Sequence, residues 1–266
     1  MRRVHLVEIH EQTWCPRVLR DGLTDFLQLG MRSLDMFGQA VPLVQRALER
    51  TGASRVVDLC AGGGGPWLRL SRQLGASDVQ VLLTDKFPSA SALRRVQGSG
   101  REGLAYRPTS VDAVDVPAEV GGFRTMFNAF HQFEPHQARA VLADAVAKGQ
   151  GIAVFECSGR TPWLLFLMTG LPALAFLLTP FVRPFSWARL FWTYVIPAIP
   201  LVVLFDGIVS CLRTYTVAEL EALAAEAGGV GWQWEAGSLR APWLPIPITY
   251  LVGTPPMAPA QVQASA

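Results

Sequence analysis

The chain has 266 residues and a formal net charge of +2 at pH 7, so it is long enough for one large domain with an insertion and carries no strong electrostatic signature of nucleic-acid binding. The first residues, MRRVHLVEIHEQ, contain no continuous apolar stretch, so we expect no secretion signal. Neither a metal site nor a disulfide framework is indicated, because the cysteines lie far apart at Cys15, Cys60, Cys157 and Cys211.

Two helices are predicted ahead of the first apolar strand. Residues 12–35 form an amphipathic pattern, with Leu19, Leu23 and Phe26 on one face and polar residues such as Arg20 and Thr24 on the other. A second helix is predicted from 41 to 50. We therefore expect an N-terminal helical cap over residues 1–51.

A carboxylate and four consecutive glycines follow the first strand, in VVDLCAGGGGPW from Val56 to Trp67. Gly62 to Gly65 predict a loop whose backbone approaches a ligand closely, because glycine has no Cβ. Trp67 occupies the position of the third glycine in a dinucleotide-binding fingerprint, and Asp58 brings a negative charge beside the loop. These features favour a cationic, nucleotide-like ligand over a dinucleotide.

This segment resembles the first motif of the class I S-adenosylmethionine-dependent methyltransferases, which reads roughly hhDhGxGxG. Asp58, Gly62 and Gly64 match the motif, whereas Cys60 stands in place of its first glycine. The resemblance covers about residues 52–160 and, more weakly, 214–254. It implies an α/β fold with a Rossmann-like methyltransferase sheet, helices on both faces, and S-adenosylmethionine as the cofactor.

Three later segments extend the resemblance. VLLTD ends a second strand in Asp85, whose carboxylate would bind the ribose hydroxyls, with Lys86 beside it. In SVDAVDVP, Asp112 and Ala113 match the loop that holds the adenine. FRTMFNAFHQF resembles the fourth strand and the loop beside the transferred methyl group, so Asn128 is included with the cofactor-binding residues, as is Cys60.

The loop after the fourth strand also contains the best candidate base, His131. Methyl transfer from a sulfonium needs a base only where the nucleophile is protonated, and imidazole titrates near neutral pH. The alternative is that His131 packs the loop. Asn128 is not followed by the Pro-Pro-Tyr/Phe pattern of methyltransferases acting on nucleobases or protein glutamine, and RNA methyltransferases with a similar first motif need active-site lysines, whereas this chain has only Lys86 and Lys148.

Two long apolar runs raise the mean hydropathy to +0.28. Residues 161–182 contain no charged side chain, and residues 190–212 contain only Asp206. As helices, these runs would each be about 33 to 35 Å long, roughly the thickness of a hydrocarbon core, and their prolines predict kinks. We interpret residues 161–213 as a kinked apolar helical hairpin that crosses a membrane twice or enters one leaflet. The alternatives are a lid over a hydrophobic substrate and a dimer interface.

The second apolar run ends in a polar stripe. Asp206, Ser210 and Arg213 are spaced i, i+4 and i+7, so they share one helical face. An ionisable side chain at membrane depth is costly and faces protein or a cavity, so we expect Asp206 to pair with Arg213 or to reach the substrate. Asp206 and Arg213 therefore join His131 as candidate catalytic residues. The alternative is a salt bridge that docks the hairpin on the catalytic domain.

The core resumes after the hairpin. Thr216 and Glu219 predict the capping box of a helix, and WQWEAGSLR and ITYLVGTP resemble the closing antiparallel strand pair of the methyltransferase sheet. Residues 255–266 are expected to form a disordered tail.

The sequence thus predicts a membrane-associated methyltransferase that acts on a hydrophobic or lipid-like acceptor, with its catalytic domain facing the cytoplasm. One alternative is a soluble small-molecule methyltransferase with an apolar lid. Another is a membrane-anchored protein that binds S-adenosylmethionine without turnover.

Overall fold

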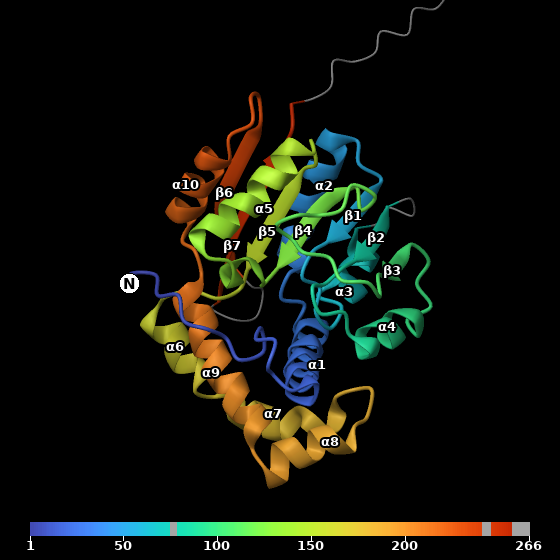
Figure 1. Cartoon of the computed structure of the whole chain (residues 1–266), viewed down its shortest axis with the longest axis vertical. Helices are drawn as coiled ribbons and strands as arrows, with labels where there is room; N and C mark the ends of the chain where they lie inside the picture. Colours follow the sequence, from blue (N-terminus) through green and yellow to red (C-terminus); the bar gives the residue numbers. More distant parts are fainter. Residues whose placement is uncertain (75–78, 241–245, 257–266) are drawn as a thin grey trace, which may run out of the picture.

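A seven-stranded sheet forms the centre of the computed structural model, which describes residues 1–74, 79–240 and 246–256 (Figure 1). The strand order is β3-β2-β1-β4-β5-β7-β6. Strands β1 to β5 are parallel, and β7 is antiparallel to both of its neighbours. The strands are β1 (Arg55–Asp58), β2 (Gln80–Leu83), β3 (Leu104–Tyr106), β4 (Phe123–Phe127), β5 (Ile152–Glu156), β6 (Gln233–Arg240) and β7 (Pro247–Thr254).

Helices cover both faces of the sheet. Apolar side chains of α2, α3 and α4 pack in one cluster with one face of the strands, and those of α5 and α10 pack with the other face. Every residue of β4 and β5 is buried, as expected for central parallel strands. The expected Rossmann-like methyltransferase fold is confirmed. The helices are α2 (Val41–Thr51), α3 (Trp67–Gln73), α4 (Ala90–Gln97), α5 (Pro135–Ala147) and α10 (Val217–Ala227).

The first sixteen residues are not helical, and α1 (Arg17–Leu34) begins five residues later than the predicted position 12. Pro16 directly precedes the helix. Residues 3–12 instead form a segment that we call the N-terminal strap. The backbone nitrogen of Val4 donates to the carbonyl of Leu212 (3.1 Å), and Arg3 donates to the carbonyl of Phe133 (2.9 Å). The strap therefore links the inserted region to the loop after β4.

The inserted region lies between β5 and α10. It consists of short helices rather than two long ones, because Pro172, Pro180 and Pro197 lie at or next to helix starts. Its elements are α6 (Pro162–Met168), α7 (Leu171–Leu178), the 3-10 turn η3 (Thr179–Phe181), α8 (Trp187–Leu190), the π-helical turn η4 (Phe191–Val195) and α9 (Ala198–Arg213).

By length and composition, one stretch of the described chain, Pro162–Phe181, is apolar enough to cross a membrane. Trp187–Val195 and Ala198–Arg213 would be a second such stretch only if they counted as one span, and they are bent by 79°.

The inserted region packs along α1 at one end of the molecule (Figure 1). Leu23 and Phe26 of α1 form a small core with Ala175 of α7 and with Ile199 and Val203 of α9. These α1 residues belong to the predicted apolar face. The predicted tail, residues 255–266, lies outside the described residues from position 257 onward.

Candidate functional site

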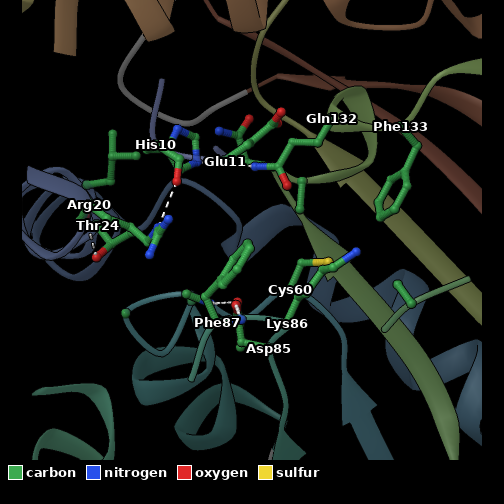
Figure 2. Close-up of a pocket in the computed structure, with 18 of the residues that line it drawn as sticks. His10, Glu11, Arg20, Thr24, Cys60, Asp85, Lys86, Phe87, Gln132 and Phe133 are labelled. Atoms are coloured by element: carbon green, nitrogen blue, oxygen red, sulfur yellow. Dashed lines mark hydrogen bonds between the residues drawn. The ribbon is translucent and has the colours of Figure 1, made fainter. Parts of the chain in front are cut away.

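A cavity of about 500 Å³ lies between the carboxyl ends of β1, β2 and β4, helix α1 and the N-terminal strap. Figure 2 shows Cys60, Asp85 and Lys86 on one side of it and His10 and Glu11 of the strap on the opposite side. Ligands of open α/β sheets bind in this position, outside the carboxyl ends of the strands.

The loop after β1 forms part of the cavity wall. Gly62 has a φ of 50°, in the left-handed region that favours glycine. A Cβ on Gly63 would lie 3.1 Å from the backbone oxygen of Thr24, so glycine lets α1 approach the loop. Cys60 also has a left-handed φ, of 58°, although it carries a side chain. The departure from the family motif at Cys60 therefore leaves the glycine-like backbone conformation in place.

Asp85 lies at the edge of the cavity, just after β2. Its Oδ2 accepts from the backbone nitrogen of Gly62 (2.7 Å), and its Oδ1 accepts from that of Phe87 (2.7 Å). Burial raises the pKa of Asp85, and these two backbone donors oppose the rise. The remaining lone pairs of both oxygens can accept hydrogen bonds from a ligand.

Four other predicted cofactor residues also line the cavity: Lys86, Asp112, Ala113 and Asn128. The ammonium group of Lys86 lies 2.8 Å from Oδ2 of Asp112, and this pair closes one edge. Asn128 has a left-handed φ of 51°, and its Oδ1 accepts from the backbone nitrogen of Cys157 (3.3 Å). Asn128 thereby joins the ends of β4 and β5.

Two predicted cofactor residues, Asp58 and Gly64, do not line the cavity. Asp58 is 1% exposed and lies beneath the glycine loop, where Thr125 donates to its Oδ1 at 2.6 Å. Burial raises the pKa of Asp58 to about 7, despite the hydrogen bonds from Thr125 and Trp67. Asp58 therefore supports the glycine loop from below and does not itself face the cavity.

The structure argues against the prediction that His131 is the base. His131 is 1% exposed and does not line the cavity. Its Nδ1 lies 2.5 Å from Glu156 Oε2, and its Nε2 lies 3.3 Å from Glu8 Oε1. Burial alone would lower its pKa, but the two carboxylates raise it to about 10. The two buried carboxylates therefore favour the protonated ring of His131, and its position away from the cavity argues against a role as the base.

Asp206 does not reach the cavity, and no ion pair joins it to Arg213 among the described residues. Its carboxylate holds the N-terminal strap. Oδ1 accepts from the backbone nitrogen of Ile9 (2.8 Å), and Oδ2 lies 2.8 Å from Nδ1 of His10. His10 lines the cavity, although no motif or spacing in the sequence marks it as a site residue.

Arg213 does line the cavity and organises a buried cluster of charges there. Its Nη1 lies 2.9 Å from Glu11 Oε2 and 3.5 Å from Glu8 Oε1, and its Nε donates to the carbonyl of His131 (3.1 Å). Glu11 also lines the cavity, and its Oε1 is buried without a hydrogen-bond partner in the described part of the chain. This oxygen is available to a donor group of a ligand.

The polar face of α1 contributes to the cavity as well. Arg20, Asp21 and Thr24 line it, and the guanidinium of Arg20 lies 4.5 Å from the ring centroid of Phe87. Asp25, from the same face, is buried behind the wall.

Comparison with solved structures finds the same fold. An O-methyltransferase family protein from Burkholderia thailandensis superposes with a TM-score of 0.50 at 14% identity, over 85% of this chain and 58% of that one. Human N-acetylserotonin methyltransferase, solved in complex with S-adenosylmethionine, gives 0.48 at 12% identity, over 87% and 55%. The S-adenosylmethionine-dependent methyltransferase SibL gives 0.48 at 17% identity, over 83% and 55%.

The chain therefore has the fold of the class I S-adenosylmethionine-dependent methyltransferases, and it spans a little over half the length of these three proteins. No protein-family model matches the sequence, and a search of curated proteins finds no match.

Proposed function

We propose that this protein binds S-adenosylmethionine and transfers its methyl group to an apolar acceptor at a membrane surface. The observation that carries the first part is Asp85, a carboxylate held by the backbone nitrogens of Gly62 and Phe87 at the cavity edge, in the fold of this class of enzyme. A carboxylate there suits two ribose hydroxyls.

The residues present fit this cofactor. The loop from Cys60 to Gly65 has left-handed backbone conformations, so it passes close to the cavity without bulky side chains. The carboxylates on the cavity wall outnumber the lysine and arginine side chains there, which suits a ligand with a sulfonium and an ammonium group. The carboxylates are Glu11, Asp21, Asp85, Asp112 and Glu134, and the cations are Arg20, Lys86 and Arg213. When bound, S-adenosylmethionine supplies an electrophilic methyl group, and the protein's part is to align it with the acceptor and exclude water.

An apolar acceptor is supported by the rest of the wall. Leu27 and Met31 of α1, Phe127 of β4 and Phe133 of the following loop line the same cavity. A second, apolar groove lies along α9 beside Ile9, the residue before His10. An apolar groove on the inserted region thus lies one residue along the strap from the cavity.

Membrane association is supported by the outer surface of the inserted region. Among the described residues, most of the exposed large apolar side chains belong to it. Tryptophan and tyrosine among them are the residues that favour a membrane–water interface. They include Trp163, Phe166, Leu174, Leu177, Phe181, Trp187, Phe191, Tyr194, Leu201 and Phe205.

Insertion into one leaflet is favoured over two crossings. Three side chains of the region contact the rest of the protein: Asp206 accepts from the backbone of Ile9, Arg213 pairs with Glu11, and Arg189 pairs with Asp25. Helix α9 also packs on α1. A crossing by α9 would require these buried polar contacts to break or α1 to enter the bilayer, and both are costly. We propose in addition that the catalytic domain lies on the cytoplasmic side.

The methyltransferase part is tested with labelled S-adenosylmethionine and lipid extracts from cells. We expect label to appear in the organic phase. Label found only in water-soluble acceptors would rule out the apolar acceptor. Tight binding of S-adenosylmethionine with no transfer to any acceptor would favour a non-catalytic binding protein.

The membrane part is tested by flotation with vesicles of phosphatidylcholine and phosphatidylglycerol. The wild type should float, and a variant with Phe181→Asp and Trp187→Asp should remain in solution. Val230→Asp is the matched control, because Val230 is fully exposed but lies outside the inserted region. Equal flotation of all three proteins, or extraction of the wild type from cell membranes by carbonate alone, would contradict insertion.

A further inference from the structure

We propose that His10, held by Asp206, removes the proton from a hydroxyl group of the acceptor, so that the acceptors of this protein are alcohols or phenols. This inference rests on the proposed methyl transfer, and it adds the acceptor atom and the residue that activates it. Neither follows from the fold, because an amine or a thiolate acceptor would need no such base in the same cavity.

The orientation of the His10 ring supports this role. Asp206 accepts from the backbone nitrogens of Ile9 (2.8 Å) and His10 (3.1 Å), and its Oδ2 lies 2.8 Å from Nδ1 of His10. A carboxylate that receives several donors is anionic and only accepts hydrogen bonds, so Nδ1 carries the hydrogen. In the neutral ring, Nε2 is then left as the proton acceptor.

The surroundings of Nε2 provide a place for the acceptor. The side-chain nitrogen of Gln132, which lines the cavity in the loop after β4, lies 3.5 Å from Nε2. This is a long contact that an acceptor hydroxyl can replace. Figure 2 shows His10 beside Glu11 and across the cavity from Cys60 and Asp85. The base and the expected cofactor residues thus face one space.

The other three histidines are less suited. His131 is paired with carboxylates at both nitrogens, and His136 is largely exposed outside the cavity. His5 lines the cavity, but its Nδ1 lies 3.3 Å from the guanidinium of Arg3 and its Nε2 lies 3.6 Å from the half-exposed Glu134. Of the four histidines, only His10 has a buried carboxylate at Nδ1 and a residue of the cavity wall, Gln132, near Nε2.

The proton balance of the step is complete without a further reactant. The hydroxyl proton moves to Nε2 of His10 while the oxygen lone pair forms a bond to the methyl carbon. The carbon–sulfur bond breaks, and its electron pair stays on sulfur, which becomes a neutral thioether. The imidazolium formed beside Asp206 and Glu8 then returns its proton to water.

The charges around His10 set the expected pH dependence. Burial lowers its pKa, but the hydrogen bond with Asp206 and the charge of Glu8 outweigh burial, so the pKa is raised above 6.5. The turnover rate should therefore increase with pH through a value above 6.5. The groups that face this site from the packed elements are Glu8 and Glu11 of the strap, Arg20 of α1, Asp85 after β2, His131 of η2 (Phe130–Gln132), and Asp206 and Arg213 of α9.

The test uses three probes in phosphatidylcholine vesicles: a long-chain 4-alkylphenol, its ortho-nitro analogue, which is ionised at the assay pH, and a long-chain amine. His10→Gln should lower kcat on the alkylphenol by about 100-fold or more, as expected for loss of a general base, and leave kcat on the nitrophenolate within a few-fold. His136→Gln, the matched control, should leave both unchanged. Asp206→Asn should lower the pH at which kcat on the alkylphenol reaches half its maximum.

A second readout does not depend on turnover. In ¹⁵N NMR spectra of the histidine rings, the signals that disappear in His10→Gln are assigned to His10. In the wild type at high pH, these signals should show the tautomer that is protonated at Nδ1. Asp206→Asn should lower the pH at which they titrate. Wild-type transfer to the amine with none to the alkylphenol would overturn this inference and leave the methyltransferase proposal intact. Equal loss on phenol and phenolate, or no loss, would overturn it as well. Binding of S-adenosylmethionine by each variant, measured by calorimetry, confirms that the cavity is folded.

Discussion

Asp25 of α1 and Arg189 of α8 form a buried ion pair, with 2.9 Å between Oδ2 and Nη1. The other oxygen of Asp25 accepts from Arg95 of α4 at 2.6 Å, and Arg95 also donates to the carbonyl of Gly63. Asp25 therefore connects the inserted region to the glycine loop.

Replacing Arg189 with methionine should lower the free energy of unfolding by about 1 to 3 kcal/mol or more, because it leaves unpaired the buried carbonyls of Val182 and Pro184 and removes one of the two arginines that pair with Asp25. Urea denaturation followed by circular dichroism measures the change. Arg50→Met, at an exposed position of α2, is the control and should change the free energy by less than about 0.5 kcal/mol. A similar small loss for Arg189→Met would show that the pair does not secure the inserted region.

Asp85→Asn should weaken binding of S-adenosylmethionine by about 10-fold or more, because hydrogen bonds to a charged group contribute about 1.5 to 3 kcal/mol. In the wild type, the two carboxylate oxygens accept from the backbone N–H groups of Gly62 and Phe87. In the variant, the amide NH₂ group faces one of these donors and cannot accept a hydrogen bond from it. Calorimetry measures the affinity. Asp115→Asn, at an exposed position, should bind as the wild type does. Unchanged affinity in Asp85→Asn would argue against this position for the cofactor.

Asp85 and the glycine loop were predictable because their signals are local. An apolar strand followed by glycines or by a carboxylate fixes where the chain turns, and parallel strands bring their carboxyl ends to one edge. The sequence did not reveal that Asp58 faces inward. Its neighbour Thr125 lies on β4, 67 positions away, and no spacing along the chain indicates that contact.

Cys60→Gly should leave S-adenosylmethionine binding intact and change the free energy of unfolding by no more than about 1 kcal/mol, with stabilisation expected. A left-handed φ costs a residue with a side chain about 1 to 2 kcal/mol, and glycine removes this cost. Glycine also raises the conformational entropy of the unfolded chain, which offsets part of the gain in stability. Cys60→Val should be destabilising. Cys157→Gly is the contrast, because Cys157 has no left-handed φ and its thiol contacts Asn128. Destabilisation of Cys60→Gly as large as that of Cys157→Gly would contradict the strain at Cys60.

The catalytic assignments show what a sequence leaves out. His131 follows a strand end that faces the cofactor in the resembling family, yet its side chain points into a cluster with Glu156 of β5 and Glu8 of the strap. His10 and Asp206 are 196 positions apart and meet only because α9 of the inserted region packs beside the strap. The one local sign of a site here was that three titratable residues, Glu8, His10 and Glu11, lie close together in the sequence. Their segment forms neither helix nor strand, so no periodic pattern predicts which way their side chains point.

The His131 cluster gives protein stability a defined pH dependence. The folded-state pKa of about 10 lies above the unfolded value of 6.5, so the stabilisation is fully present below pH 6.5 and is lost as the pH rises from there toward 10, where the unfolded chain binds fewer protons than the folded one.

Urea denaturation at a series of pH values between 6 and 10 should therefore show a falling free energy of unfolding for the wild type. His131→Gln should be less stable at pH 6, because it removes the cation beside Glu156 and one of the cations beside Glu8, and it should show a flatter dependence over this range. His136→Gln, at an exposed position, should keep the wild-type slope. If His131→Gln kept that slope too, His131 would be neutral in the folded protein, and its exclusion as a base would no longer hold.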